Sequence, residues 1–211
     1  MRRRGILAVV SGFSGAGKGT LMKNLLKQYG NYALSISMTT RLPREGEEDG
    51  REYFFVSKEI FEEKVERNGF IEYACYCDNY YGTPREYVEY QLDMGKDVLL
   101  EIEIQGALKV KEKFPEALLL FVMPPSAKEL KNRLTGRGTE TPDVVSKRLN
   151  RAILEAQGIE NYDYIVINDD LEICTQELHS IINTAHKSVR RNEEFIENMR
   201  QELNVLVKGE K

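Results

Sequence analysis

The order of the apolar segments predicts an α/β protein whose parallel sheet is covered by helices on both faces. Residues 6–10, 117–123 and 164–167 are short apolar runs with the length and composition of buried strands, and residues 98–104 form a fourth. Helical patterns separate these runs. Strands that alternate with helices are joined by crossover connections, so the expected sheet is parallel and buried on both faces.

Local start signals place the helices between these strands. Residues 21–28 have a helical pattern shortly after the first strand. Ser126 opens the sequence SAKE, a capping box, so a helix is expected to start there. Proline suits the first turn of a helix, and one stands at the beginning of the apolar-striped segment 142–157. Residues 171–204 are expected to form one or two C-terminal helices.

Two segments interrupt the alternation. Residues 38–95 include the turn-rich sequence PREGEEDG and aromatic, strand-like runs at 53–56 and 70–76. Residues 136–143, GRGTETPD, are polar, glycine-rich and flanked by arginines, as expected of a mobile flap that closes over a site. We therefore predict a single domain over residues 1–211, with a core at 1–37 and 96–211, an inserted mixed α+β lobe at about 38–95, and a small mobile lid at about 133–151.

The composition is that of a soluble globular protein. The chain has 211 residues, of which 41% are hydrophobic and 30% charged, and its formal net charge is −4. That charge gives no indication of a nucleic-acid polymer or a membrane as partner. Residues 6–10 are too short for a signal-peptide core or a membrane span, so a cytoplasmic protein is expected. Cys75, Cys77 and Cys174 fit neither a disulfide framework nor a zinc site.

A glycine-rich loop lies between the first strand and the first helix. Its residues are Gly12, Phe13, Ser14, Gly15, Ala16, Gly17, Lys18, Gly19 and Thr20. Glycines let backbone N–H groups converge on phosphate oxygens, and the helix N-terminus adds positive potential. Lys18 supplies a mobile charge for the β- and γ-phosphates, which a turn that merely joined strand to helix would not explain. The sequence therefore predicts a nucleotide-binding P-loop in a P-loop NTPase-type sheet.

The loop and the strand at 98–104 contain two candidate Mg²⁺ ligands. The strict phosphate-loop pattern has Ser or Thr directly after the lysine, whereas here the hydroxyl comes one residue later, at Thr20. Glu101 and Glu103 are two apart and would share one face of a strand at its carboxyl end, where parallel sheets bind ligands. Glu101 therefore suits Mg²⁺, directly or through water, and Glu103 would face an acceptor. The alternative is a pair of solvated carboxylates.

A second group of residues forms a candidate oxyanion site. Arg41 and Arg44 lie three apart with hydroxyls beside them, and a guanidinium binds phosphate through two parallel hydrogen bonds. Further polar and aromatic candidates in this part of the chain are Ser37, Tyr53, Glu72, Tyr81 and Thr83. Each has a structural alternative when taken singly: a core tyrosine, a solvated glutamate or, for Thr83, the N-cap of a capping box. Their order downstream of a P-loop favours a binding site.

Cationic residues also lie around the glycine-rich flap at residues 136–143. Arg133 and Arg137 lie four apart where the chain enters it, and Arg148 lies on the helix that leaves it. Charge on the oxygens of a transferring phosphoryl group requires fixed cations in a dry site. For Lys147 and Arg151 a solvated helix face is the expected position.

These motifs, in this order, resemble the guanylate kinase family over nearly the whole chain. The matching strings are GFSGAGKGT, SISMTTRLPREGEEDGREYFF, FIEYACYCDNYYGTP, LLEIEIQGALKVK, LKNRLTGRGTETPDVVSKRLNRA and YDYIVIND. The resemblance implies that the GMP phosphate is bound by Ser37, Arg41, Arg44, Tyr53 and Tyr81, that guanine is recognised by Glu72 and Thr83, and that the triphosphate is covered by Arg133, Arg137 and Arg148. Thr83 stands where the family often has Ser, Phe13 where proline is usual, and Glu101 and Glu103 where Asp is frequent.

The guanine assignment is also consistent with hydrogen-bonding chemistry. Guanine presents N1–H and N2–H₂ as neighbouring donors, and the Glu72 carboxylate can accept both. Guanine O6 requires a donor, which the Thr83 hydroxyl supplies. Adenine has an acceptor at N1 that would face Glu72 repulsively. Asn168, after the last strand, is expected to lie beside the adenine of ATP.

The sequence thus predicts a guanylate kinase that moves the γ-phosphoryl group of ATP to GMP or dGMP with Mg²⁺. The expected catalytic residues are Lys18, Arg41, Arg133, Arg137 and Arg148. No general base is expected, because the attacking phosphate oxygen is already ionised and catalysis is positioning plus charge neutralisation. Two alternatives are a partner-binding module of a scaffold protein and a kinase acting on a phosphorylated sugar. The expected oligomeric state is a monomer or a homodimer.

Overall fold

The computed structural model describes residues 3–76, 78–136 and 142–209. Its strands are β1 (Leu7–Gly12), β2 (Tyr32–Leu34), β3 (Ser37–Thr39), β4 (Tyr53–Phe55), β5 (Phe70–Tyr76), β6 (Asn79–Pro84), β7 (Asp97–Glu101), β8 (Leu118–Met123) and β9 (Tyr164–Ile167). Its α-helices are α1 (Lys18–Gln28), α2 (Lys58–Glu66), α3 (Arg85–Asp93), α4 (Ile104–Lys113), α5 (Ala127–Thr135), α6 (Pro142–Ala156), α7 (Leu171–Ala185) and α8 (Glu193–Gly209). Two short 3₁₀ turns are η1 (Ile159–Asn161) and η2 (Val189–Asn192).

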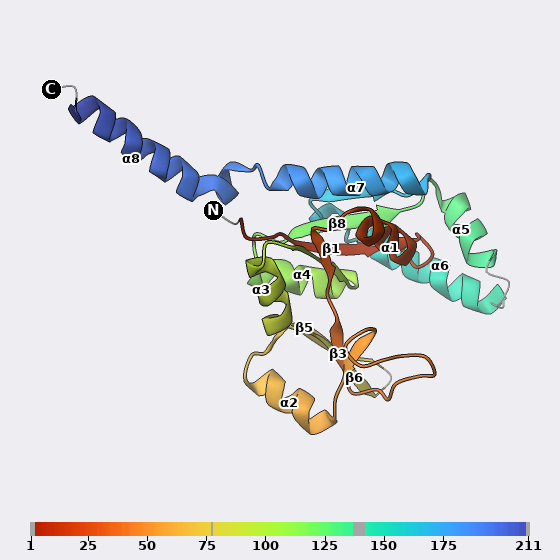
Figure 1. Cartoon of the computed structure of the whole chain (residues 1–211). Coiled ribbons are helices and arrows are strands. Elements are labelled where there is room, and N and C mark those ends of the chain that lie inside the picture. The colour runs from red at the N-terminus through yellow and green to blue at the C-terminus, as the bar shows by residue number, and fades with distance from the viewer. Residues whose placement is uncertain (1–2, 77, 137–141, 210–211) are drawn as a thin grey trace.

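The larger sheet is parallel and has the strand order β2-β7-β1-β8-β9. Side chains alternate across the central strand β1: Ala8 and Val10 pack in the core that α1 and α7 cover, whereas Leu7 and Val9 pack with α3 and α4. Figure 1 shows α1 and α7 on one side of this sheet and α3 and α4 on the other. The predicted α/β fold, a parallel sheet flanked by helices, is confirmed.

A smaller mixed sheet has the order β4-β3-β6-β5. β3 pairs in parallel with β4 and antiparallel with β6, and β6 pairs antiparallel with β5. This sheet and α2 lie beyond α3 and α4, away from α1 and α7 (Figure 1). Helix α3, which belongs to the segment we predicted as an inserted lobe, packs Val88 and Leu92 in the core cluster of the parallel sheet. It therefore connects the two sheets physically.

One predicted strand is shorter than expected. The apolar pattern predicts a strand over 98–104, but β7 ends at Glu101 and α4 begins at Ile104. Glu103 is the N-cap residue of α4, so it does not continue the strand face that carries Glu101. The hydroxyl of Ser11 donates to the carbonyl of Ile102 (2.7 Å) and so fixes this turn, which a periodicity argument does not detect.

The structural alternative for Thr83, the N-cap of a helix, does not occur in the structure. The N-cap of α3 is Pro84, with no side-chain cap hydrogen bond, and the Thr83 hydroxyl donates to Glu72 instead. By contrast Ser126 accepts from the backbone N–H of Glu129 at the start of α5, as the capping box predicts. The Thr83 hydroxyl bonds to Glu72 rather than to the helix because β5 and β6 are adjacent strands, which brings the two side chains together.

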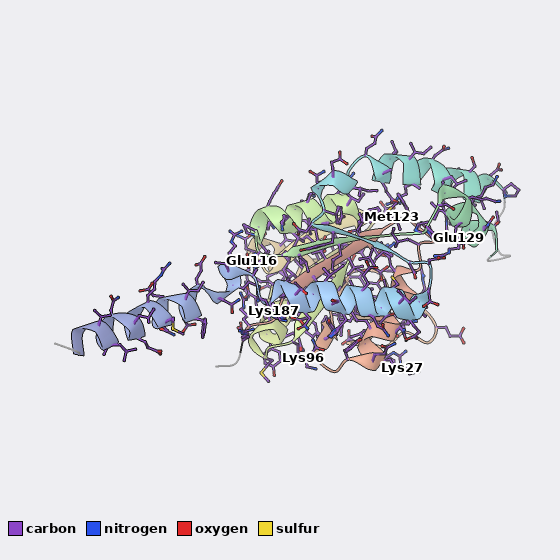
Figure 2. The ribbon with its side chains drawn as sticks, turned by 90° about the horizontal axis from the view of Figure 1, so that it is seen from above. Lys27, Lys96, Glu116, Met123, Glu129 and Lys187 are labelled. Carbon is purple, nitrogen blue, oxygen red and sulfur yellow. The ribbon has the colours of Figure 1, made fainter. Side chains whose placement is uncertain are left out.

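The carboxyl ends of the parallel strands lie at one end of the molecule. Figure 2 shows Met123, at the carboxyl end of β8, on the same side as Glu129 of α5. Lys96 and Glu116, which lie just before β7 and β8, are toward the other side, where α8 projects from the body. Among the described residues, no helix is long and apolar enough to cross a membrane.

Candidate active site

The glycine-rich loop folds as a tight curl between β1 and α1. Gly15 and Gly17 have φ of 90° and 88°, in the left-handed region that favours glycine. A Cβ on Gly17 would lie 2.5 Å from the amide nitrogen of Asn168, so a larger residue would clash there as well. The ammonium of Lys18 donates to the carbonyl of Gly12 (2.7 Å) and to that of Phe13 (3.2 Å). Its charge is therefore held over the loop.

Two residues predicted for the donor site, Asn168 and Phe13, have buried side chains that stabilise the loop. The buried Asn168 donates from Nδ2 to the carbonyl of Ala16 (2.8 Å), so its amide contacts the loop backbone. Phe13 is buried and packs edge-on against Phe121, with ring centroids 5.1 Å apart. Only the backbone of Phe13 is thus placed to face a phosphate. The adenine contact of Asn168 stays a prediction.

A cavity of about 560 Å³ lies next to this loop. Its lining includes Ser14 and Lys18 from the loop and α1, and Arg148 from α6. Burial lowers the pKa of the Lys18 ammonium, while the nearby carboxylates of Glu101, Glu155 and Glu103 oppose that shift. Arg151 lies exposed on α6, as expected, and it also lines this cavity.

A second cavity, of about 410 Å³, is lined by residues of the smaller sheet, of the end of β7 and of α4. Six of the residues predicted for an acceptor line it: Ser37, Tyr53, Glu72, Tyr81, Glu101 and Glu103. Gln105 and Lys109 line it too, and sequence reasoning missed both. They lie four apart on α4, the spacing that puts two side chains on one helical face. Lys109 adds a cation whose charge acts on Glu72.

The carboxylate of Glu72 is held from behind by Thr83. The Thr83 hydroxyl is fully buried and donates to Oε1 of Glu72 (2.7 Å). Burial raises the pKa of Glu72, and the hydrogen bond from Thr83 and the charges of Lys109 and Lys113 oppose that shift. Thr83 is not among the residues that line the cavity, so in this structure its proton fixes Glu72 rather than facing a ligand.

The predicted arginine pair is organised by Glu47. Arg41 donates through Nη2 to both carboxylate oxygens of Glu47 (2.9 Å each), and its guanidinium lies 5.4 Å from the ring centroid of Tyr53. The backbone N–H of Arg44 also donates to Glu47 (2.8 Å). The hydrogen bond from the Arg44 N–H contributes most to lowering the pKa of Glu47, and the hydrogen bond from Arg41 lowers it further. Sequence reasoning missed Glu47, although it lies in the same turn-rich segment as the two arginines.

The lid arginines are only partly placed at the site. Arg133 donates from Nε to Glu129 one turn earlier on α5 (2.8 Å) and does not line the donor-side cavity. Arg148 does line it. Arg137 lies outside the described residues. The predicted closure of all three over a triphosphate therefore stays a prediction.

The candidate Mg²⁺ ligands are hard oxygen donors of the type this ion prefers. Thr20 lies exposed in the first turn of α1, and Glu101 lines both cavities. Desolvation raises the pKa of the Glu101 carboxyl, and the charge of Lys18 opposes that shift. Glu101 is nevertheless exposed to the solvent in the cavity. The described residues hold no cluster of three or more metal-binding side chains. The residues fit an ion bound mainly by substrate phosphates and waters.

Comparisons with known proteins agree on one family. A family model described as guanylate kinase matches residues 4–185. The guanylate kinase of Clostridioides difficile (strain 630) is 50% identical over 202 residues, which cover 95% of this chain and 98% of that protein. The guanylate kinase of Caldanaerobacter subterraneus subsp. tengcongensis is 47% identical over 202 residues, covering 96% and 98%. The crystal structure of guanylate kinase from Anaplasma phagocytophilum superposes with a TM-score of 0.70 at 32% identity, covering 90% of this chain and 91% of that chain. The family model and the relatives, together with the loop and the two cavities, show that this chain belongs to the guanylate kinase family and is a nucleoside monophosphate kinase.

Proposed function

We propose that this protein transfers the γ-phosphoryl group of ATP to GMP or dGMP in a Mg²⁺-dependent reaction. The observation that carries the proposal is the arrangement of the two cavities. One lies against the phosphate loop, the other contains Glu72, and Glu101 and Glu103 line both. Because the two cavities share part of their lining, a phosphoryl group leaving a nucleotide in the first would be next to an acceptor in the second.

The acceptor cavity suits GMP. The Glu72 carboxylate, fixed by Thr83, can accept from N1–H and N2–H₂ of guanine. Ser37, Tyr53 and Tyr81 line the same cavity and would bind the phosphate of the nucleotide. Arg41, held by Glu47 and lying over the ring of Tyr53, would be the cation nearest to that phosphate, and Arg44 would complete the phosphate site. Thr83 serves this recognition by orienting Glu72.

The donor side supplies charge and position. Lys18 and the backbone of the phosphate loop bind the β- and γ-phosphates of ATP, and Arg148 contributes a further cation. Thr20 and Glu101 would hold Mg²⁺ through its waters, and the bound ion supplies charge neutralisation on the phosphates. The attacking GMP phosphate oxygen is ionised, so no residue acts as a general base. The lid at about 133–151, with Arg133 and Arg137, would exclude water on closure.

A coupled assay of ADP formation with a panel of acceptors tests the proposal. ATP with GMP or dGMP should give turnover that EDTA abolishes and excess Mg²⁺ restores. AMP, CMP, UMP and a sugar phosphate should give little. Turnover with the sugar phosphate alone would assign another acceptor, and no turnover with any acceptor would favour a binding module. We place the reaction in the cytoplasm, where both nucleotides occur.

A further inference from the structure

The two cavities share part of one wall. Tyr53, Glu101, Ile102 and Glu103 line both of them. Glu103 is the N-cap residue of α4, yet its side chain makes no cap hydrogen bond to the helix. A carboxylate at this position is therefore available to a partner from another element.

That partner is Arg151 of α6. Its Nη2 forms an ion pair with Oε1 of Glu103, and its Nε donates to Oε1 of Glu155 at 3.0 Å. Arg151 and Glu155 are four residues apart, so they face each other on consecutive turns of α6. One guanidinium thus connects α6 to the N-terminus of α4, two residues after the end of β7.

Glu155 is less exposed than the carboxylate of an ordinary solvated ion pair on a helix surface. Its side chain is only 18% exposed, compared with 48% for Arg151 and 72% for Glu103. Its Oε2 is buried and has no hydrogen-bond partner within the described part of the chain. A carboxylate in such a place costs free energy unless cations lie beside it, and here Arg151 does so.

We propose that Arg151 and Glu155 are positioning residues that hold Glu103 at the wall shared by the two substrate cavities. Glu155 fixes the guanidinium of Arg151, and Arg151 fixes the carboxylate of Glu103. Through this chain of contacts the helix on the donor side sets the geometry of a group that faces the acceptor.

The arrangement has a specific consequence, which rests on the proposed function. Arg151 and Glu155 line the donor-side cavity and are not among the residues that line the acceptor cavity. Substitutions confined to the donor side would ordinarily alter ATP binding only. If Glu103 depends on them, they must also weaken GMP binding when no ATP is present.

Calorimetry of GMP binding without ATP is the direct test, on Arg151→Met, Glu155→Gln and the double variant. Arg151→Met should raise the Kd of GMP about tenfold, within the range of measured couplings between contacting residues. Glu155→Gln should raise it about threefold or more by the same reasoning. Because both act through one contact, the double variant should bind GMP no worse than Arg151→Met alone.

Asn150→Ala, an exposed position on the same helix, is the matched control and should leave the Kd of GMP unchanged. Arg151→Lys keeps a cation without the planar fork, so it should give an intermediate Kd, and it carries the test if Arg151→Met does not fold. GMP affinity equal to the wild type in both single variants, or a double variant whose loss is the product of the two, overturns this inference. Failure of the wild type to bind GMP at all would instead refute the proposed function.

Discussion

Replacing Glu72 with Gln is the sharpest probe of base recognition. Oε1 of Glu72 already accepts from Thr83 (2.7 Å), so the carboxylate must serve the ligand with its remaining lone pairs. A glutamine has one acceptor oxygen. If that oxygen keeps accepting from Thr83, the NH₂ group of the glutamine faces the two guanine donors, and no hydrogen bond can form between donors. A lost charge-assisted bond costs about 1.5–3 kcal/mol and an unsatisfied buried donor about 1–3 kcal/mol more, which together correspond to roughly 10²–10⁴ in kcat/KM.

Steady-state kinetics with GMP and AMP on both proteins measure this effect. The wild type should neglect AMP, and Glu72→Gln should lose GMP efficiency and narrow the gap between the two substrates. Glu66→Gln, an exposed glutamate of the same segment, should change neither value. An unchanged GMP/AMP ratio in Glu72→Gln would refute the role of Glu72.

The pH dependence of GMP binding provides a second test of the role of Glu72. Burial raises this pKa above its ordinary value, and guanine needs the ionised form. GMP affinity should therefore be complete above the raised pKa and fall as the pH drops through it. Calorimetric titrations across the acid range should show that decline in the wild type and a flatter profile in Glu72→Gln. Parallel profiles in the two proteins would assign the pH dependence to another group.

Three further substitutions test the donor side. Lys18→Ala should fold and lose roughly two or more orders of magnitude in kcat, because a charge aimed at the transferring group is removed; near-normal turnover would exclude Lys18 from the mechanism. Arg148→Ala should lower kcat more than it weakens GMP binding, and calorimetry showing the reverse would place Arg148 at the acceptor. Asn168→Ala should raise the KM for ATP and lower the melting temperature, because the buried carbonyl of Ala16 loses its donor at about 1–3 kcal/mol; an unchanged KM for ATP would mean that the amide does not shape the loop.

Elements whose signals lie within a few neighbouring residues can be predicted from the sequence. The strand at 164–167 and the helix start at Ser126 follow from patterns within a few residues, and the structure has both where expected. The strand predicted to reach residue 104 shows the limit of such patterns. An apolar run does not distinguish a strand from the first turn of the helix after it.

The candidate site shows the same division. Glycine spacing and Lys18 predict a phosphate loop because the loop is one continuous segment, and the family resemblance supplied the acceptor residues in their order. Glu47, Lys109 and Glu155 were missed because a single carboxylate or ammonium in a sequence has no local pattern that marks its partner.

Sequence alone thus determined the parallel α/β core and the glycine-rich loop between its first strand and helix, because both depend on short-range periodicity or on a contiguous motif. The family resemblance supplied most of the six predicted acceptor residues that line one cavity. Tertiary structure alone decided which side chains meet. Asn168 and Ala16 are 152 positions apart in the chain, and their contact fixes the loop. Thr83 would have been assigned to a helix cap on local grounds, yet the pairing of β5 with β6 brings its hydroxyl to Glu72. A hydrogen bond goes to whichever partner the packing of distant elements brings within about 3 Å, and that distance is a property of the folded chain.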